Sequence, residues 1–119
     1  MATITPTITR LNSTVDTRQC WLVTWASIGD SDTCTAVEFG AATDRSVQIN
    51  GTFNSATVVL QGSNDGTNYV SLTDPQGNAI SKTSAALEQV QEATRYIRPS
   101  SSGGSSSSTN VYLFMVKKS

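Results

Sequence analysis

The sequence predicts an all-β protein, a single-domain antiparallel β-sandwich or barrel. Short segments that alternate apolar with polar residues recur about every 8 to 12 residues, and turn sequences separate them. The 119 residues include 17 Thr, which favours strands, and 17 Ser, which favours turns. A chain of this length fits one domain with its own hydrophobic core. We therefore expect a sandwich over residues 16–119, preceded by an extended arm or edge strand over residues 1–15.

Residues 1–15 alternate Thr with Ile on either side of Pro6, which is the pattern of a strand with one apolar face. Proline cannot donate a backbone hydrogen bond, so Pro6 confines the segment to a sheet edge or to an extended arm. Two interpretations stay open: an ordinary first edge strand, or an arm that pairs with a neighbouring chain. In the second interpretation, Ile4, Pro6 and Ile8 are candidate interface residues.

Two further segments, 19–28 and 109–117, are apolar on both faces. Such a strand is either central in a sandwich or buried at a subunit contact. In the first segment two tryptophans share a face, and tryptophan is enriched in cores and in interface hot spots. In the second, aromatic residues share a face with a valine. The candidate interface residues of these segments are Trp21, Val23, Trp25, Tyr112, Phe114 and Val116.

The remaining strands follow from the same alternation. We expect strands at 35–40, 46–53, 56–63, 68–73 and 94–99. The sequences GDSDT at 29–33 and DPQGN at 74–78 predict turns, and Asn50-Gly51 predicts a turn or a bulge inside its strand.

Two later segments are less regular. Residues 84–92 contain good helix formers with apolar residues at a helical period, so they predict either one short helix or an extended edge segment. The run SSSGGSSSST at 100–109 predicts a flexible low-complexity loop.

The loop at 62–68, GSNDGTN, connects two apolar runs. Asp, Asn and Gly can hold a cation or a sugar, but in loops Asp and Asn more often bond their own backbone. We expect a hairpin connection in which Asn64 and Asp65 bond the turn and Gly66 takes a positive φ. Whether the loop also binds a ligand stays open.

The composition argues against several functions. The net charge is −1 and the only adjacent basic pair is Lys117-Lys118, so we expect no nucleic-acid partner. No apolar stretch is long enough for a membrane helix, and the N-terminus lacks the features of a signal peptide, so we expect synthesis in a cytoplasm without export by that route. Histidine is absent and no catalytic motif is present, so we expect no enzyme, no metal and no cofactor.

The chain has two cysteines, Cys20 and Cys34. In a reducing compartment they are best interpreted as small, buried or half-buried side chains. Whether they pair in a disulfide stays open, because pairing depends on strand neighbours that the sequence does not define.

The stretch VVLQGSNDGTNYVSL followed by TRYIRP resembles the discoidin-like, galactose-binding jelly roll, in which a GSNDG hairpin follows one strand and an RYIR strand comes later. The resemblance covers Thr57 to Pro99. It implies a β-sandwich and does not carry sugar binding with it.

The longer run from INGTF to the C-terminal strand, residues 49 to 116, resembles small structural proteins encoded among the head genes of tailed bacteriophages. That resemblance implies a capsid decoration, or cement, protein. It would sit on the outer surface of the assembled shell in the virion, with other copies of itself as a homotrimer and with the major capsid protein as partners.

Two other classes of function stay open. One is a carbohydrate-binding adhesion module on a phage surface, which would use Trp21, Trp25 or the 62–68 loop. The other is a head-completion or tail structural protein, which would form a ring.

Overall fold

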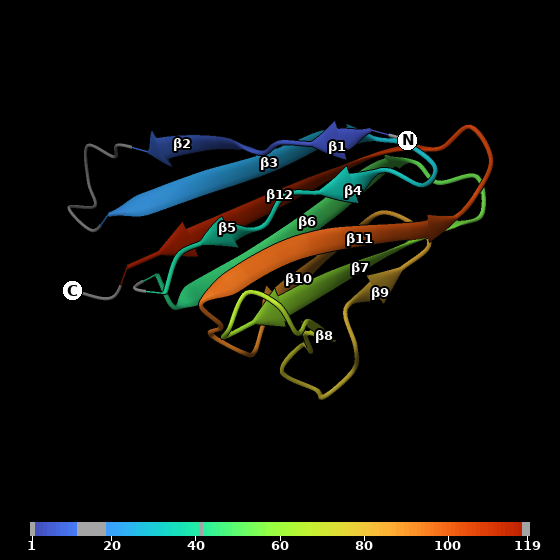
Figure 1. The fold of residues 1–119 in the computed structure, drawn as a ribbon. Coiled ribbons are helices and arrows are strands. Elements are labelled where there is room, and N and C mark those ends of the chain that lie inside the picture. Colours follow the sequence, from blue (N-terminus) through green and yellow to red (C-terminus); the bar gives the residue numbers. More distant parts are fainter. Residues whose placement is uncertain (1, 12–18, 41, 118–119) are drawn as a thin grey trace.

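The computed structural model describes residues 2–11, 19–40 and 42–117 and shows two antiparallel sheets packed face to face (Figure 1). This confirms the predicted all-β sandwich. The first five-stranded sheet, here the β12 sheet, has the order β10 (Ala86–Val90), β6 (Asp44–Thr52), β12 (Ser108–Val116), β3 (Cys20–Ile28) and β2 (Thr7–Leu11).

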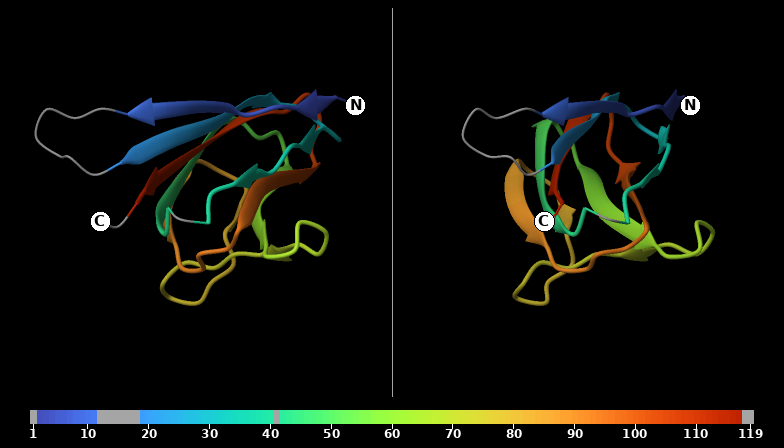
Figure 2. Two further views of the ribbon diagram at one scale, coloured as in Figure 1. Left: turned by 60° about the vertical axis from the view of Figure 1, so that its left-hand side comes forward. Right: turned by 90° about the vertical axis from the view of Figure 1, so that its left-hand side faces the viewer.

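The second sheet, here the β7 sheet, has the order β5 (Val37–Glu38), β11 (Tyr96–Gly103), β7 (Ala56–Ser63) and β8 (Val70–Ser71), and β9 (Ser81–Lys82) also pairs with β7. A short parallel pair, β1 (Thr3–Ile4) with β4 (Thr33–Cys34), forms a separate ladder. The side views show it along the edge between the two layers (Figure 2).

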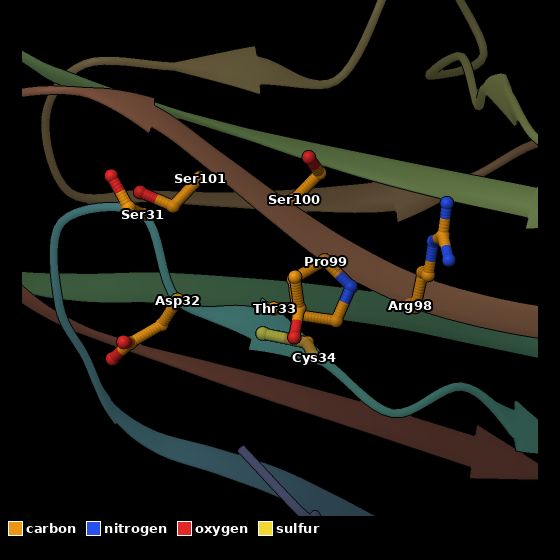
Figure 3. Close-up of a pocket in the computed structure, with 8 residues that line it drawn as sticks. All are labelled: Ser31, Asp32, Thr33, Cys34, Arg98, Pro99, Ser100 and Ser101. Atoms are coloured by element: carbon orange, nitrogen blue, oxygen red, sulfur yellow. The ribbon is translucent and has the colours of Figure 1, made fainter. Parts of the chain in front are cut away.

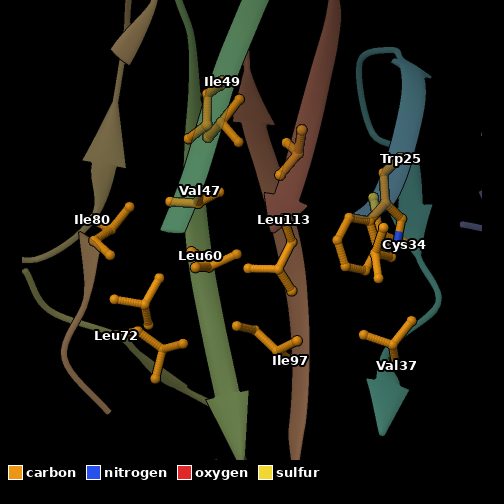
Figure 4. Close-up of a cluster of buried hydrophobic side chains, with 14 of the residues drawn as sticks. Trp25, Cys34, Val37, Val47, Ile49, Leu60, Leu72, Ile80, Ile97 and Leu113 are labelled. Atoms are coloured by element: carbon orange, nitrogen blue, oxygen red, sulfur yellow. The ribbon is translucent and has the colours of Figure 1, made fainter. Parts of the chain in front are cut away.

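Alternating residues of the central strands form the core between the sheets (Figure 4). On β12 the odd-numbered residues Val111, Leu113 and Met115 are fully buried, as the period of two in a strand requires. Strand β3 also turns its odd-numbered residues inward, because the register pairs Val23 with Leu113 and Trp25 with Val111.

The expectation that Val23 and Trp25 contribute to an interface is therefore corrected. Both side chains are 0% exposed, so they have no surface to offer a partner. The indole Nε1 of Trp25 donates to the Thr35 carbonyl at 2.8 Å, which satisfies its one polar atom inside the core.

The helical interpretation of residues 84–92 is wrong, and the extended interpretation holds. Residues 86–90 form β10, which pairs with β6. Leu87 is 68% exposed and Val90 is 4% exposed, so burial follows the pleat of an edge strand. Pairing with β6 outweighed the intrinsic helix propensity of these residues.

The flexible loop expected at 100–109 is also corrected. Strand β11 continues to Gly103 and β12 begins at Ser108, so the connection is confined to residues 104–107. The serines pair with β7, and Ser100 lies opposite Val59. Backbone pairing needs no particular side chain, so a serine run can form a strand.

The N-terminal residues pair within their own chain. Residues 3–4 and 7–11 form β1 and β2, which describes an edge strand over this part of the segment. The rest of the expected 1–15 segment, residues 1 and 12–15, lies outside the described residues.

One end of the sandwich is closed by a buried arginine. Arg45 is 3% exposed, and its guanidinium donates to the carbonyls of Ala42 at 2.8 Å and of Phe39 and Thr94 at 2.7 Å. One side chain therefore ties the turn before β6 to the segment before β11.

Candidate functional site

The outer face of the β12 sheet carries a cluster of apolar side chains, here the outer patch. Because β3 and β12 turn their odd-numbered residues into the core, their even-numbered residues point outward. The register then places them in rows: Phe114 lies beside Leu22, and Val116 beside Cys20. The edge strand adds Leu11 beside Cys20. The outer patch consists of Leu11, Cys20, Leu22, Tyr112, Phe114 and Val116.

The patch is partly open to solvent. Phe114 is 37% exposed and is among the most exposed large apolar side chains of the described residues, while the other five are half-buried against one another. Polar residues surround them: the uncharged Thr24 and Gln48 flank Tyr112, Thr9 lies beside Leu22, and Asp44 lies beside Val116. Asp44 is the only charged side chain that the register points outward on the described part of this sheet.

A hollow of about 430 Å³ adjoins the patch at the end of the sheet. Phe114 and Val116 form its apolar wall, and Asp44, Ser46 and Gln89 contribute its polar rim. This hollow is a shallow depression that is largely open to solvent.

The structure sorts the predicted interface residues into three groups. Tyr112, Phe114 and Val116 lie on the outer patch. Val23 and Trp25 are core residues, and Trp21 is half-buried with its ring centroid 5.3 Å from that of Phe39. The N-terminal candidates are apart from the patch: Ile4 packs against the core, Pro6 is half-buried, and Ile8 is 51% exposed at the edge.

Sequence analysis missed three members of the patch: Leu11, Cys20 and Leu22. The alternation along 19–28 showed two apolar faces. We assigned the interface to the face with the two tryptophans, and that face is the one turned towards the core. Leu11 is a single apolar residue in a polar context, so only its register opposite Cys20 reveals it.

The loop at 62–68 is the predicted hairpin connection between β7 and β8. The Asp65 carboxylate accepts the backbone N–H groups of Thr67 and Asn68, each at 2.9 Å, and Gly66 has a φ of +79°. Those bonds, with side-chain bonds from Asn68 and Ser63, hold the pKa of Asp65 well below its usual range. Asn64 departs from the expectation, because its Oδ1 accepts from the backbone of Arg95.

A second hollow, of about 230 Å³, lies between the turn at 31–34 and residues 98–101 of β11 (Figure 3). Two of its charged side chains already serve the fold, whereas the buried Oγ of Ser101 in its lining has no hydrogen-bond partner among the described residues. The two carboxylate oxygens of Asp32 accept the backbone N–H groups of Ala2 and Gly29, each at 2.8 Å. Arg98 stacks on Tyr69, with its guanidinium carbon 3.7 Å from the ring centroid.

The Cys34 thiol lines the same hollow, and burial raises its pKa to about 11. The thiol therefore stays protonated at neutral pH and is a poor nucleophile. Both cysteines are free, which answers the question of their pairing in this structure.

Over the described residues, no three His, Cys, Asp or Glu side chains are grouped so that they could hold a metal ion. No helix in that part of the chain is long and apolar enough to cross a membrane. The chain matches no protein-family model, no curated protein and no solved structure.

Proposed function

We propose that this protein is a structural protein of a bacteriophage virion, a capsid decoration protein that associates with copies of itself through the outer patch and binds the outside of the assembled shell. The single observation that carries the proposal is the apolar outer face of a sheet whose inner face already forms the core. The sequence resemblance to phage head proteins supplies the biological setting.

The occupant that suits the outer patch best is another copy of this chain. The face carries almost no charge, so two or three copies can meet without like charges facing each other. Covering Phe114 and Leu22 would remove apolar surface from water, worth about 25 cal/mol for each Å². The polar rim keeps the isolated chain hydrated, which suits a protein that assembles after folding. We propose a homotrimer, the arrangement that the resemblance implies.

A decoration protein needs to bind the finished shell more strongly than the free coat subunit. Binding only the assembled state stabilises that state by mass action. Three joined copies would present three equivalent contacts, which increases avidity at a three-fold position of the shell. The loops at the ends of the sandwich and the edge strands other than β2 remain available for those contacts.

Co-sedimentation with empty shells assembled from the major capsid protein of the same phage tests the proposal. We expect saturable binding of the wild-type protein and density at three-fold positions in electron micrographs. Phe114→Asp should reduce binding at least about tenfold, because a buried carboxylate opposes association. Val70→Asp is the matched control, since Val70 is 66% exposed on the other sheet.

Equal losses for the two variants would remove the outer patch from the account. A ring at a single vertex of the shell would identify a head-completion or tail protein instead. Retention on a glycan array without binding to shells would favour the carbohydrate-binding alternative.

A further inference from the structure

The edge strand β2 is a second exposed feature of the β12 sheet. Among the described residues, strand β2 ends this sheet and pairs on one side only, with β3. An unpaired edge presents N–H and C=O groups that can bond another strand. Residues 7–11 contain no proline and no bulge in their register, and Arg10 is their only charged residue.

The register identifies which backbone groups point outward. Lys117 donates to the Gln19 carbonyl at 2.9 Å, so Gln19 and the odd-numbered residues after it bond β12. Alternate residues of an antiparallel strand bond opposite neighbours, so Cys20, Leu22 and Thr24 bond β2. Their partners on β2 are Leu11, Thr9 and Thr7. The N–H and C=O groups of Ile8 and Arg10 therefore face the free edge.

We propose that this edge pairs antiparallel with β2 of a second copy of the chain, with a two-fold axis at Thr9. In this register the outward N–H and C=O of Ile8 in each copy bond the C=O and N–H of Arg10 in the other copy. Pro6, which has no N–H, comes next along the same edge and ends the ladder. Every outward amide between Pro6 and the end of β2 then has an acceptor.

The side chains fit the same register. Thr9 lies opposite Thr9 of the other copy, a favourable cross-strand pair, and Thr7 lies opposite Leu11. Arg10 lies opposite Ile8, so the two arginines are offset along the strands. This self-complementarity is the reason to assign the edge to a second copy, since an isologous contact requires one segment to match itself about a two-fold axis.

The contact goes beyond the proposed function, because it would link decoration trimers to one another. A three-fold contact through the outer patch and a two-fold contact through β2 together extend over a surface as a network. The patch contact buries outward side chains of β3, β12 and Leu11, whereas the edge contact is made by the backbone N–H and C=O groups of β2.

Amide hydrogen exchange tests the edge contact directly. We expect the Ile8 and Arg10 amides to exchange at least about tenfold more slowly at millimolar than at micromolar protein. The Thr7, Thr9 and Leu11 amides should be protected at both concentrations, because they bond β3. The Phe114→Asp variant should show the same concentration dependence at Ile8 and Arg10, since it leaves the edge intact.

Two substitutions at one position supply the matched control. Ile8→Pro removes the outward N–H, replaces the isoleucine side chain and fixes φ at about −65°. It should abolish the concentration dependence at Arg10, while the Thr9 amide stays protected. Ile8→Thr keeps the N–H and should retain the dependence.

If the exchange rates of the Ile8 and Arg10 amides do not vary with protein concentration, the edge contact is overturned. If the protein nevertheless has the molar mass of an oligomer, association through the outer patch remains supported. Protection of these amides only in the presence of shells would also overturn self-pairing, because the occupant would then be a strand of another protein. If the Ile8 and Arg10 amides are protected but the molar mass does not change with Phe114→Asp, the result counts against association through the outer patch.

Discussion

At the scale of residues, three aspartates hold the ends and loops of the sandwich in place. Asp65 bonds the 62–68 loop, Asp32 bonds the N-terminal strand, and Asp30 bonds the β11–β12 connection through Ser106 and Ser107. Their hydrogen bonds hold the pKa of each carboxyl below 3.8. The Asp65 bonds stay within the 62–68 loop, so the sequence predicted that turn. The bonds of Asp30 and Asp32 to residues far along the chain leave no local signal.

These lowered pKa values give the stability a defined dependence on pH. A carboxylate whose pKa is lower in the folded than in the unfolded state stabilises fully above the unfolded value and loses that contribution as pH falls through the folded value. We expect a constant thermal midpoint from pH 7 to about 5 and a decline below about 4. Asp65→Asn should lower the midpoint at pH 7 and weaken the decline. An unchanged acid decline in the variant would show that Asp65 does not contribute.

Arg45 is a buried polar residue whose loss should destabilise the fold. Arg45→Met keeps an apolar stem and removes three hydrogen bonds to carbonyls, so we expect a loss of about 2–4 kcal/mol in the free energy of unfolding. Urea denaturation measures it. Arg95→Met is the control: Arg95 lies in an exposed pair with Glu38, worth about 0–1 kcal/mol. Similar losses for the two variants would contradict the role given to Arg45.

At the scale of elements, the sequence predicted strands well where the spacing of apolar residues along one segment was enough to define the strand. Alternation along 19–28, 56–63 and 109–117 defined β3, β7 and β12. Alternation did not identify β10 or the start of the serine run as strands. These segments are extended because they pair with neighbouring strands, not because of their own residue pattern. A partner strand is distant in sequence and leaves no local signal.

The same limit explains the candidate site. Sequence analysis recognised that β3 and β12 are apolar on both faces, but which face is buried depends on where the second sheet packs. The structure turns Trp25 inward and Leu22 outward. The aromatic residues of β12 were placed on the outer face only once the register was known.

The close pairing of β6 with β12 at Gly51 leads to a prediction at the scale of elements. Gly51 has a φ of +119°, and a Cβ there would lie 2.4 Å from the Ser108 carbonyl oxygen. Both strand backbones would have to move, so we expect Gly51→Ala to cost about 2 kcal/mol or more by urea denaturation. Gly40→Ala is the control, because a Cβ at Gly40 meets nothing within 4 Å. A neutral Gly51→Ala would show that the strands can separate there without cost.

At the scale of the whole molecule, the two sheets differ in what their outer faces offer. The β7 sheet presents charged and aromatic pairs, such as Arg98 on Tyr69, together with the 62–68 hairpin. The β12 sheet presents an almost uncharged face with an apolar centre and a free strand edge. This difference is the reason to assign assembly to the β12 sheet.

The molar mass of the Ile8→Pro protein in solution, by light scattering at micromolar concentration, tests that assignment most directly, because this background lacks the edge contact. The account predicts three times the chain mass of 12.6 kDa. It also predicts a fall towards the monomer mass when Phe114→Asp is added, with no change for Val70→Asp. A monomer mass for the Ile8→Pro protein itself would contradict association through the outer patch. An unchanged mass after Phe114→Asp is added, in a protein that is still folded, would also contradict it.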